Sequence, residues 1–231
     1  MDSMWVIPEA IIDCHWLKDR YDRQDIRIYD CTSYLHYTDE HPSQPYDVVS
    51  GFDNYCRSHI PNAAFLDLQQ DLSENNSPYS FTIPALHDLA ERFKKQGVGE
   101  PFHIILYSAN GMQWATRIWW MLYAVGYQRV SILNGGFAAW QEAGLPTQES
   151  ITKWEPAEFE ARPKPNIFVG KQRVLDAIAD EKTVLLNALT SDLHLGKSAR
   201  YGRPGRIPTS PNIPFTSFMK IGRDFGDIYI D

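Results

Sequence analysis

Short, continuously apolar segments alternate along this sequence with segments whose apolar residues recur about every 3.6 residues, and this alternation constrains the fold most. The clearest apolar segment is His103-Ile104-Ile105-Leu106-Tyr107, which is typical of a strand covered on both faces of a parallel sheet. Three more strands are predicted, at residues 26–29, 129–133 and 183–186. Five helices are predicted around them, at residues 8–19, 84–96, 112–125, 137–143 and 169–179. The order of these elements predicts an α/β fold with a mainly parallel sheet.

Charge and composition exclude several classes of protein. The 231 residues include 22 Lys and Arg against 29 Asp and Glu, a net charge of −7, so we expect neither a nucleic acid nor a membrane as partner. No apolar run approaches the ~18–20 residues of a membrane helix. The N-terminus lacks the basic and apolar regions of a signal peptide. Because the three cysteines cannot all pair within one chain, we expect a reduced, cytoplasmic protein.

The pattern of elements runs through the chain once and then begins again. Residues 1–148 are predicted to form one complete domain, and residues 149–165 a linker rich in Glu, Lys and Pro. Residues 166–231 are predicted to form the N-terminal half of a second domain. His59-Ile60-Pro61 in the first part is echoed by Arg206-Ile207-Pro208 in the second. This echo predicts an internal duplication.

Four motifs occur in a fixed order. Residues 55–63 read Tyr-Cys-Arg-Ser-His-Ile-Pro-Asn-Ala, and residues 133–140 read Leu-Asn-Gly-Gly-Phe-Ala-Ala-Trp. Arg117-Ile118-Trp119-Trp120 lies between them, and residues 201–208 read Tyr-Gly-Arg-Pro-Gly-Arg-Ile-Pro. Together they resemble the rhodanese family, specifically its two-domain sulfurtransferases acting on thiosulfate or 3-mercaptopyruvate. The resemblance implies a central parallel sheet of about five strands flanked by helices, as one complete domain plus an incomplete second copy.

The resemblance also implies a reaction, in which sulfane sulfur passes from a small anionic donor to a thiol or cyanide through a cysteine persulfide. Backbone N–H groups and a helix N-terminus stabilise such a thiolate. The segment after residue 107 has this architecture, but Ser108 occupies the place of the nucleophile, and a hydroxyl cannot carry a persulfide. We interpret the loop as a structural turn or as a vestigial anion cradle that still receives a ligand. Its residues are Ser108, Ala109, Asn110, Gly111, Met112 and Gln113.

The family resemblance places the catalytic cysteine in the second domain, in a part that the 231 residues do not include. We therefore name no catalytic residue and expect this chain to be inactive. Where the family usually has Asp-Ala-Arg, this sequence has Asn187-Ala188-Leu189, and Arg206 stands where His is usual. We interpret Arg200, Arg203 and Arg206 as candidate contacts for the anionic donor. The alternative is a solvated basic loop.

Each of the three cysteines has a structural interpretation. Cys14 and Arg20 match the C-x5-R spacing of a phosphatase loop, but the residues between them are bulky or acidic and are predicted to be helical. Cys31 follows a strand without a glycine-rich loop, which predicts a buried thiol. Cys56 and His59 supply only two of the four ligands of a zinc site. His59 is instead expected to fix its loop by hydrogen bonding. No metal or organic cofactor is predicted.

Two functions stay open at this point. The first is a sulfurtransferase lineage, and the second is a non-catalytic binding or regulatory protein on the same fold. A rhodanese-like phosphatase is not expected, because no Cys precedes a suitable loop that ends in Arg. Half a domain leaves apolar surface uncovered, so we also expect possible self-association through the incomplete second domain.

Overall fold

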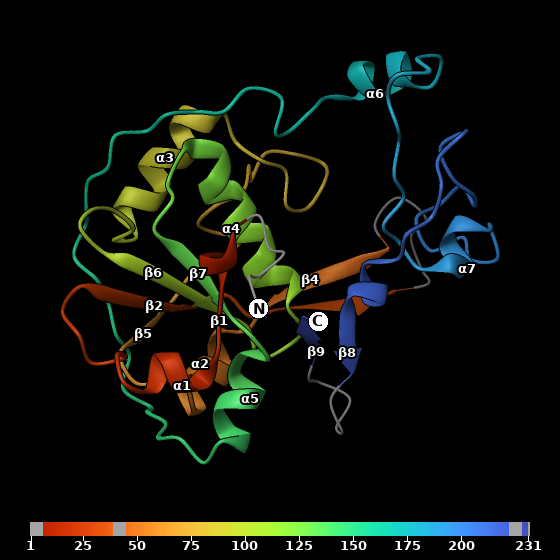
Figure 1. Cartoon of the computed structure of the whole chain (residues 1–231). Coiled ribbons are helices and arrows are strands. Elements are labelled where there is room, and N and C mark those ends of the chain that lie inside the picture. Colours follow the sequence, from red (N-terminus) through yellow and green to blue (C-terminus); the bar gives the residue numbers. More distant parts are fainter. Residues whose placement is uncertain (1–6, 39–44, 222–227, 231) are drawn as a thin grey trace. The chain divides into compact units, whose positions relative to one another are not determined.

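A five-stranded parallel sheet is the main sheet of this computed structural model, which describes residues 7–38, 45–221 and 228–230 (Figure 1). The strand order is β1-β7-β6-β2-β5. These strands are Ile11–Ile12, Val130–Leu133, His103–Tyr107, Ile26–Asp30 and Ala63–Phe65. In the register, Ile28 lies opposite Ile105 on one side and Ala63 on the other. The predicted α/β fold with a mainly parallel sheet is confirmed.

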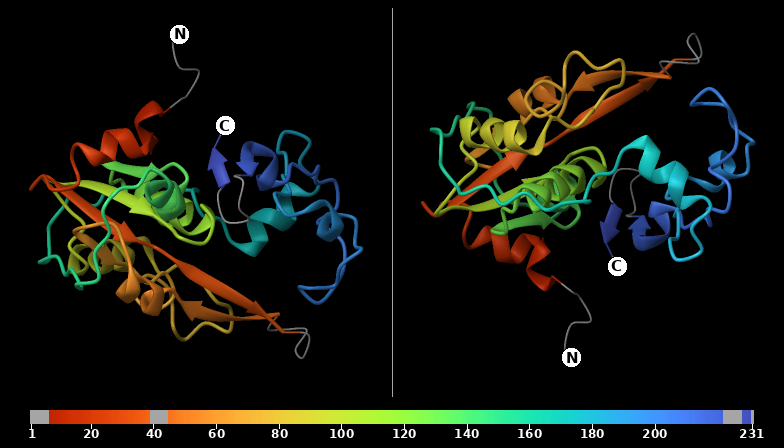
Figure 2. Two further views of the ribbon diagram at one scale, coloured as in Figure 1. Left: turned by 90° about the horizontal axis from the view of Figure 1, so that it is seen from below. Right: turned by 90° about the horizontal axis from the view of Figure 1, so that it is seen from above.

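Helices cover both faces of this sheet, so its central strands are almost wholly buried. In Figure 1, α3 (Leu86–Lys95) and α4 (Gln113–Val125) lie above the sheet, and the two views of Figure 2 show the same arrangement. On the opposite face lie α1, α2 and α5, which are Cys14–Lys18, Phe52–Arg57 and Gly136–Glu142. All of β2 is buried, as are the last four residues of β6. A continuous apolar run thus marked a strand with two covered faces.

The predicted helix over residues 8–19 is wrong in its first half. A 3-10 turn, Pro8–Ala10, leads into β1, and α1 begins only after Asp13. The Asp13 carboxylate accepts a hydrogen bond from the Trp16 N–H at 2.8 Å and caps this helix. Ile11 pairs with Ile132 of β7, so an edge position in the sheet replaces the first helical turn.

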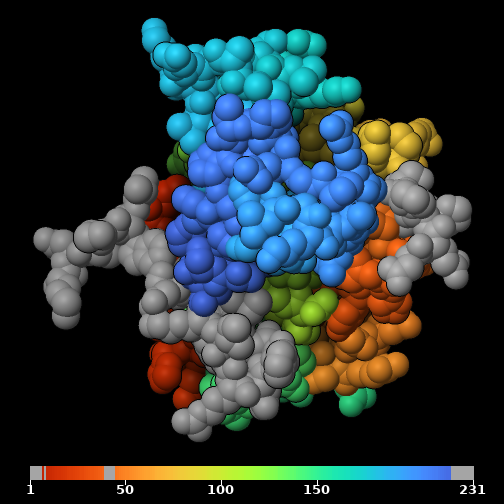
Figure 3. All heavy atoms as spheres, turned by 90° about the vertical axis from the view of Figure 1, so that its right-hand side faces the viewer, coloured from red at the N-terminus to blue at the C-terminus, as the bar shows by residue number. Residues whose placement is uncertain are grey.

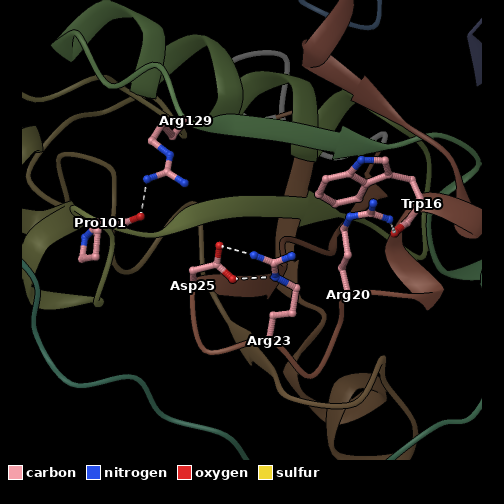
Figure 4. Close-up of polar contacts among 6 residues, drawn as sticks. All are labelled: Trp16, Arg20, Arg23, Asp25, Pro101 and Arg129. Carbon is pink, nitrogen blue, oxygen red and sulfur yellow. Dashed lines mark hydrogen bonds and ion pairs between the residues drawn. The ribbon is translucent and has the colours of Figure 1, made fainter.

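The amino edge of the sheet is fixed by short polar contacts (Figure 4). The Arg23 guanidinium forms a two-fold ion pair with Asp25, at 2.8 and 2.9 Å, just before β2. The Asp25 carbonyl accepts the His103 N–H at the start of β6, at 2.8 Å. Arg129, just before β7, donates to the Pro101 carbonyl. These contacts align the three central strands at the end where each begins.

The chain divides into two compact units. Among the described residues, the first comprises 7–34, 48–164, 221 and 228–229, and the second comprises 35–38, 45–47, 165–220 and 230. Strands β3 (Ser33–Tyr37) and β4 (Tyr46–Ser50) pair as a separate two-stranded sheet, and so do β8 (Met219–Ile221) and β9 (Ile228–Ile230). The domain boundaries at 148 and 165, and the duplication, stay predictions.

Residues 149–164, expected to be a linker, follow the surface of the first unit. The Ala157 N–H donates to the Lys94 carbonyl at the end of α3, at 3.0 Å. The N–H groups of Arg162 and Lys164 donate to the carbonyls of Val125 and Ala124 at the end of α4. Carbonyls at a helix C-terminus have no partner within the helix, and this segment satisfies several of them.

The second unit has little regular structure. It contains α6 (Lys171–Ala177), α7 (Ser191–His194) and the 3-10 turn Phe215–Phe218. The predicted strand over residues 183–186 is wrong: in the described structure no strand pairs with it, and only an isolated bridge joins Asn187 to Asn212. Val184 is 75% exposed and Leu186 53% exposed. Figure 3 shows this unit's surface in cyan to blue.

The longest helix, α4, has 13 residues, so none of the helices in the described part of the chain could span a bilayer.

Candidate functional site

The loop after β6, singled out from the sequence, lies at the carboxyl edge of the sheet. Ser108 is buried, and its carbonyl accepts the N–H of Phe137 at 3.1 Å. Gly136, with φ +58°, passes so close that an added Cβ would lie 2.2 Å from the Ser108 oxygen. The Gly-Gly-Phe motif therefore lets the loop after β7 pack directly on the loop after β6.

The first two amides of this loop are engaged inside the protein. The Ala109 N–H donates to the Thr32 hydroxyl at 2.9 Å, and the Asn110 N–H donates to the Ser108 hydroxyl at 3.1 Å. The Asn110 side chain donates to the Ser33 carbonyl at 3.1 Å. Gln113, in the first turn of α4, donates to the Asn110 carbonyl at 3.2 Å. An anion would compete with these contacts, so the vestigial cradle stays a prediction.

A cavity of about 220 Å³ opens beside this loop. Its lining comes from several elements: Asp30, Thr32, Asn54, Tyr55, Arg57, Ser58, Ala109 and Phe137. Asp30 ends β2 and is 2% exposed. Its carboxylate accepts the Thr32 N–H at 2.9 Å and the Thr32 hydroxyl. Burial raises the pKa of Asp30 to about 6, although these hydrogen bonds act in the opposite direction.

Neither Cys14 nor Cys31 has the surroundings of a reactive thiolate. Cys14 begins α1, and burial followed by the nearby Asp13 charge raises its pKa to about 11. Cys31 is fully buried, its thiol contacts the Tyr29 carbonyl at 3.7 Å, and burial raises its pKa well above the usual value. The prediction of a buried thiol at Cys31 and of a helix at Cys14 is confirmed. Cys56 is half-buried in α2.

His59 fixes its loop, as expected. Its Nδ1 lies 2.7 Å from the Tyr55 carbonyl, and its ring stacks on the Tyr55 ring at 4.0 Å. Its backbone pairs in both directions with Gln148. In the residues that the structure describes, no three His, Cys, Asp or Glu side chains are grouped as they would be around a metal ion.

The second unit contains a larger cavity, of about 820 Å³, lined by two of the three candidate arginines. Arg203 and Arg206 lie on one stretch of its wall, and residues 185–189 form another. Arg206 Nη1 donates to the His194 carbonyl at 3.3 Å. Arg200 is not part of the lining. Its guanidinium lies 4.2 Å from the centre of the Tyr37 ring.

The segment that replaces the family's Asp-Ala-Arg has a defined shape. The Asn187 side chain accepts the Leu189 N–H at 2.9 Å. The Asn212 side chain donates to the carbonyls of Asn187 and Leu189, at 2.9 and 2.8 Å. These contacts hold residues 187–189 in a tight turn at the cavity wall. The wall that carries Leu186 and Leu189 is apolar, and the one that carries the two arginines is cationic.

Sequence reasoning missed the residues of the smaller cavity. In the sequence, Asp30 was notable only as the residue between a predicted strand and Cys31. A signal was present, because Asp30 is a carboxylate at the carboxyl end of a strand parallel to β6, which ends at Tyr107 just before Ser108. Ligands of α/β proteins bind at this edge of the sheet. Arg57 and Ser58 offered no comparable signal, since only the fold brings them to the same cavity.

Comparisons with known proteins agree with this architecture. A family model described as a rhodanese-like domain matches residues 13–143. The 3-mercaptopyruvate sulfurtransferase of Mus musculus is 32% identical over 219 residues, which cover 91% of this chain and 70% of that protein. The enzyme of the same name from Escherichia coli K12 is 29% identical, with 96% of this chain and 75% of that protein covered.

A solved structure is also similar. It is SseA from Escherichia coli, a crystal structure with the rhodanese fold of 3-mercaptopyruvate sulfotransferases. Its TM-score is 0.72 at 27% identity, and the match covers 91% of this chain and 77% of that one.

Proposed function

Because this chain belongs to the rhodanese family of sulfurtransferases, we propose that its second unit binds a small anionic sulfur donor, thiosulfate or 3-mercaptopyruvate, through Arg203 and Arg206. One observation carries the proposal: both arginines line the same cavity as residues 185–189. Relatives named for 3-mercaptopyruvate support this class of donor.

The chemistry of the two side chains suits such a ligand. A guanidinium donates two parallel hydrogen bonds to a carboxylate or a comparable oxyanion, and it stays protonated at all physiological pH values. Among the described ion pairs, none includes Arg203 or Arg206, so no carboxylate of the described residues pairs with them. Leu186 and Leu189 add an apolar wall beside the two guanidinium groups.

The proposal assigns no persulfide to this chain. A sulfane sulfur carrier needs an accessible thiolate, and Cys14 and Cys31 are buried with raised pKa values. Cys56 lies half-buried in the last turn of α2, at the opposite end of the helix from the N-terminus that stabilises anions. The 231 residues therefore contribute donor binding, and the thiol that accepts the sulfur is not one of these three.

Calorimetry with thiosulfate and with 3-mercaptopyruvate tests donor binding on the purified chain. Arg203→Gln and Arg206→Gln are each expected to weaken binding about tenfold, or about 1.4 kcal/mol. Arg200→Gln is the matched control, because Arg200 stacks on Tyr37 outside the cavity lining, and it should leave the affinity unchanged. Equal effects of all three substitutions would indicate a general charge effect and contradict the assignment.

Thiocyanate formation from thiosulfate and cyanide tests the inactive state separately. We expect no activity above background, and no mass increase of one sulfur atom on any cysteine after incubation with the donor. Donor-dependent activity that Cys56→Ser abolishes would overturn this part of the proposal. A chain that neither binds the donors nor turns them over would favour the non-catalytic binding protein.

The second unit also supports a proposal about self-association. Large apolar side chains stay exposed on it, among them Val184, Leu195 and Phe218. We propose that two copies of the chain associate through these exposed side chains, because exposed apolar surface favours interfaces. Light scattering after size-exclusion chromatography should give a molar mass that increases with protein concentration. The Val184→Glu variant should have a lower molar mass at the same concentration. A monomer at all concentrations would contradict the proposal.

A further inference from the structure

We propose that the cavity at the carboxyl edge of the first unit's sheet binds a small zwitterionic α-amino acid, with Asp30 contacting the ammonium group and Arg57 contacting the carboxylate. This site lies in the first unit and differs from the proposed donor site in both location and ligand charge. Asp30 and Arg57 both line the cavity of about 220 Å³.

The charge of Asp30 is the first argument. Its partners are all neutral: the Thr32 N–H, the Thr32 hydroxyl and the Tyr107 hydroxyl. Among the described residues, none of the ion pairs includes Asp30. The other titratable groups that interact with it are Tyr55 of α2 and Cys31, and neither supplies a positive charge. A buried carboxylate without a counter-ion is costly, so a cation in the adjoining cavity gains a strong interaction.

Arg57 supplies the opposite charge on the same cavity. It ends α2 and is exposed, and its guanidinium contacts the neutral Asn54 side chain at 3.4 Å. No carboxylate of the described residues pairs with it. A ligand that carries both an ammonium and a carboxylate can therefore satisfy both walls at once. An anion alone would be repelled by the unpaired carboxylate of Asp30, and a cation alone would be repelled by the guanidinium of Arg57.

The size of the cavity limits the ligand. Its volume of about 220 Å³ equals the share of roughly seven water molecules in liquid water, which admits ligands of about five to seven heavy atoms such as glycine, alanine or serine. Phe137 forms an apolar part of the wall, and the hydroxyls of Thr32 and Ser58 offer neutral hydrogen bonds.

Ligand-observed NMR and calorimetry on the whole 231-residue chain test the proposal with three probes. L-Alanine carries both charges, ethylamine only the cation and propionate only the anion. We expect alanine to bind at least about tenfold more tightly than either fragment. Absence of alanine binding at millimolar concentration, or equal binding of propionate, would overturn the proposal.

Two substitutions separate the two contacts. Arg57→Gln should weaken alanine binding about tenfold and should not weaken ethylamine binding, whereas Asp30→Asn should weaken alanine and ethylamine binding and should not weaken propionate binding. Arg23→Gln is the matched control, because this exposed arginine pairs with Asp25 at the amino edge of the sheet (Figure 4). Unchanged alanine affinity in Arg57→Gln would contradict the proposal. Alanine donates no sulfur, so its failure to bind would leave the donor site at Arg203 and Arg206 unaffected.

Discussion

At the scale of single residues, burial separates the cysteines from one another. Cys31 is fully buried and Cys14 is 8% exposed, whereas Cys56 is half-buried on α2. Sequence reasoning predicted both the helix at Cys14 and the buried thiol at Cys31 from their neighbours alone. It could not predict the charge on the cavity wall, because Asp30 and Arg57 are 27 residues apart and meet only in the fold.

Thiol modification should follow this order. With iodoacetamide at mildly alkaline pH, we expect Cys56 to react first in the folded chain, while Cys14 and Cys31 stay largely unmodified. The raised pKa of Cys14, about 11, keeps its thiolate fraction small. Peptide mass spectrometry identifies the modified residue. Cys56→Ser should remove the fast reaction, and rapid labelling of Cys31 in the folded chain would contradict its burial.

The buried carboxyl group of Asp30 should make stability depend on pH. Its pKa of about 6 in the folded chain exceeds the ordinary value of 3.8, so the folded state binds this proton more tightly than the unfolded state does. The resulting stabilisation is complete below about pH 4 and is lost as the pH rises through about 6, by about 3 kcal/mol.

Asp30→Asn tests this dependence, because the amide oxygen still accepts from Thr32 but does not titrate. Urea denaturation between about pH 4 and pH 7 should show a smaller decrease in the free energy of unfolding for the variant than for the parent chain. Parallel curves for the two chains would mean that Asp30 has an ordinary pKa.

At the scale of elements, the periodicity of apolar residues predicted several helices and strands of the first unit correctly. The apolar run of β6 and the amphipathic pattern of α4 predicted both elements almost to their ends. The pattern failed at residues 8–19, where pairing with β7 replaces a helical turn. It failed again at residues 183–186, because a strand forms only beside a partner strand, and the described structure gives it none.

The contact between the loops after β6 and β7 should be sensitive to a single methyl group. Gly136→Ala places a Cβ 2.2 Å from the Ser108 carbonyl oxygen at a positive φ, and we expect a loss of about 3 kcal/mol or more in the free energy of unfolding. Gly144 also has a positive φ, but nothing lies within 4 Å of an added Cβ, so Gly144→Ala should cost only about 1 kcal/mol.

Chemical denaturation of both variants measures the difference. Since the backbone strain is similar at the two positions, the excess loss in Gly136→Ala reports the crowding at Ser108. Equal losses would show that the two loops are not in close contact.

At the scale of the whole molecule, the two units differ in how much apolar surface they bury. The first unit encloses a core that includes Ile28, Ile105 and Trp140. Within residues 165–220, Ala177 and Leu193 are the buried apolar side chains, while Val184, Leu195 and many others stay exposed. Family resemblance predicted the fold of the first unit well. It could not predict that residues 35–38 and 45–47 group with the second unit.

Limited proteolysis should follow this difference. Trypsin is expected to cut first within residues 165–220, at exposed sites such as Arg173 and Arg200, because segments with few buried apolar contacts open most easily. A resistant fragment ending near Lys171, the first cleavable site after Lys164-Pro165, should keep the circular dichroism of the α/β sheet. First cuts within residues 48–164 would contradict the division into units.

The path of residues 149–164 has a mechanical consequence. Their hydrogen bonds to the ends of α3 and α4 are spaced along the segment, at Ala157, Arg162 and Lys164. A force pulling on the chain beyond residue 164 would load these hydrogen bonds one after another. To separate the parallel strands, the same force would have to break many backbone hydrogen bonds at once. Under tension, residues 149–164 would detach from the first unit while its five-stranded sheet stayed intact.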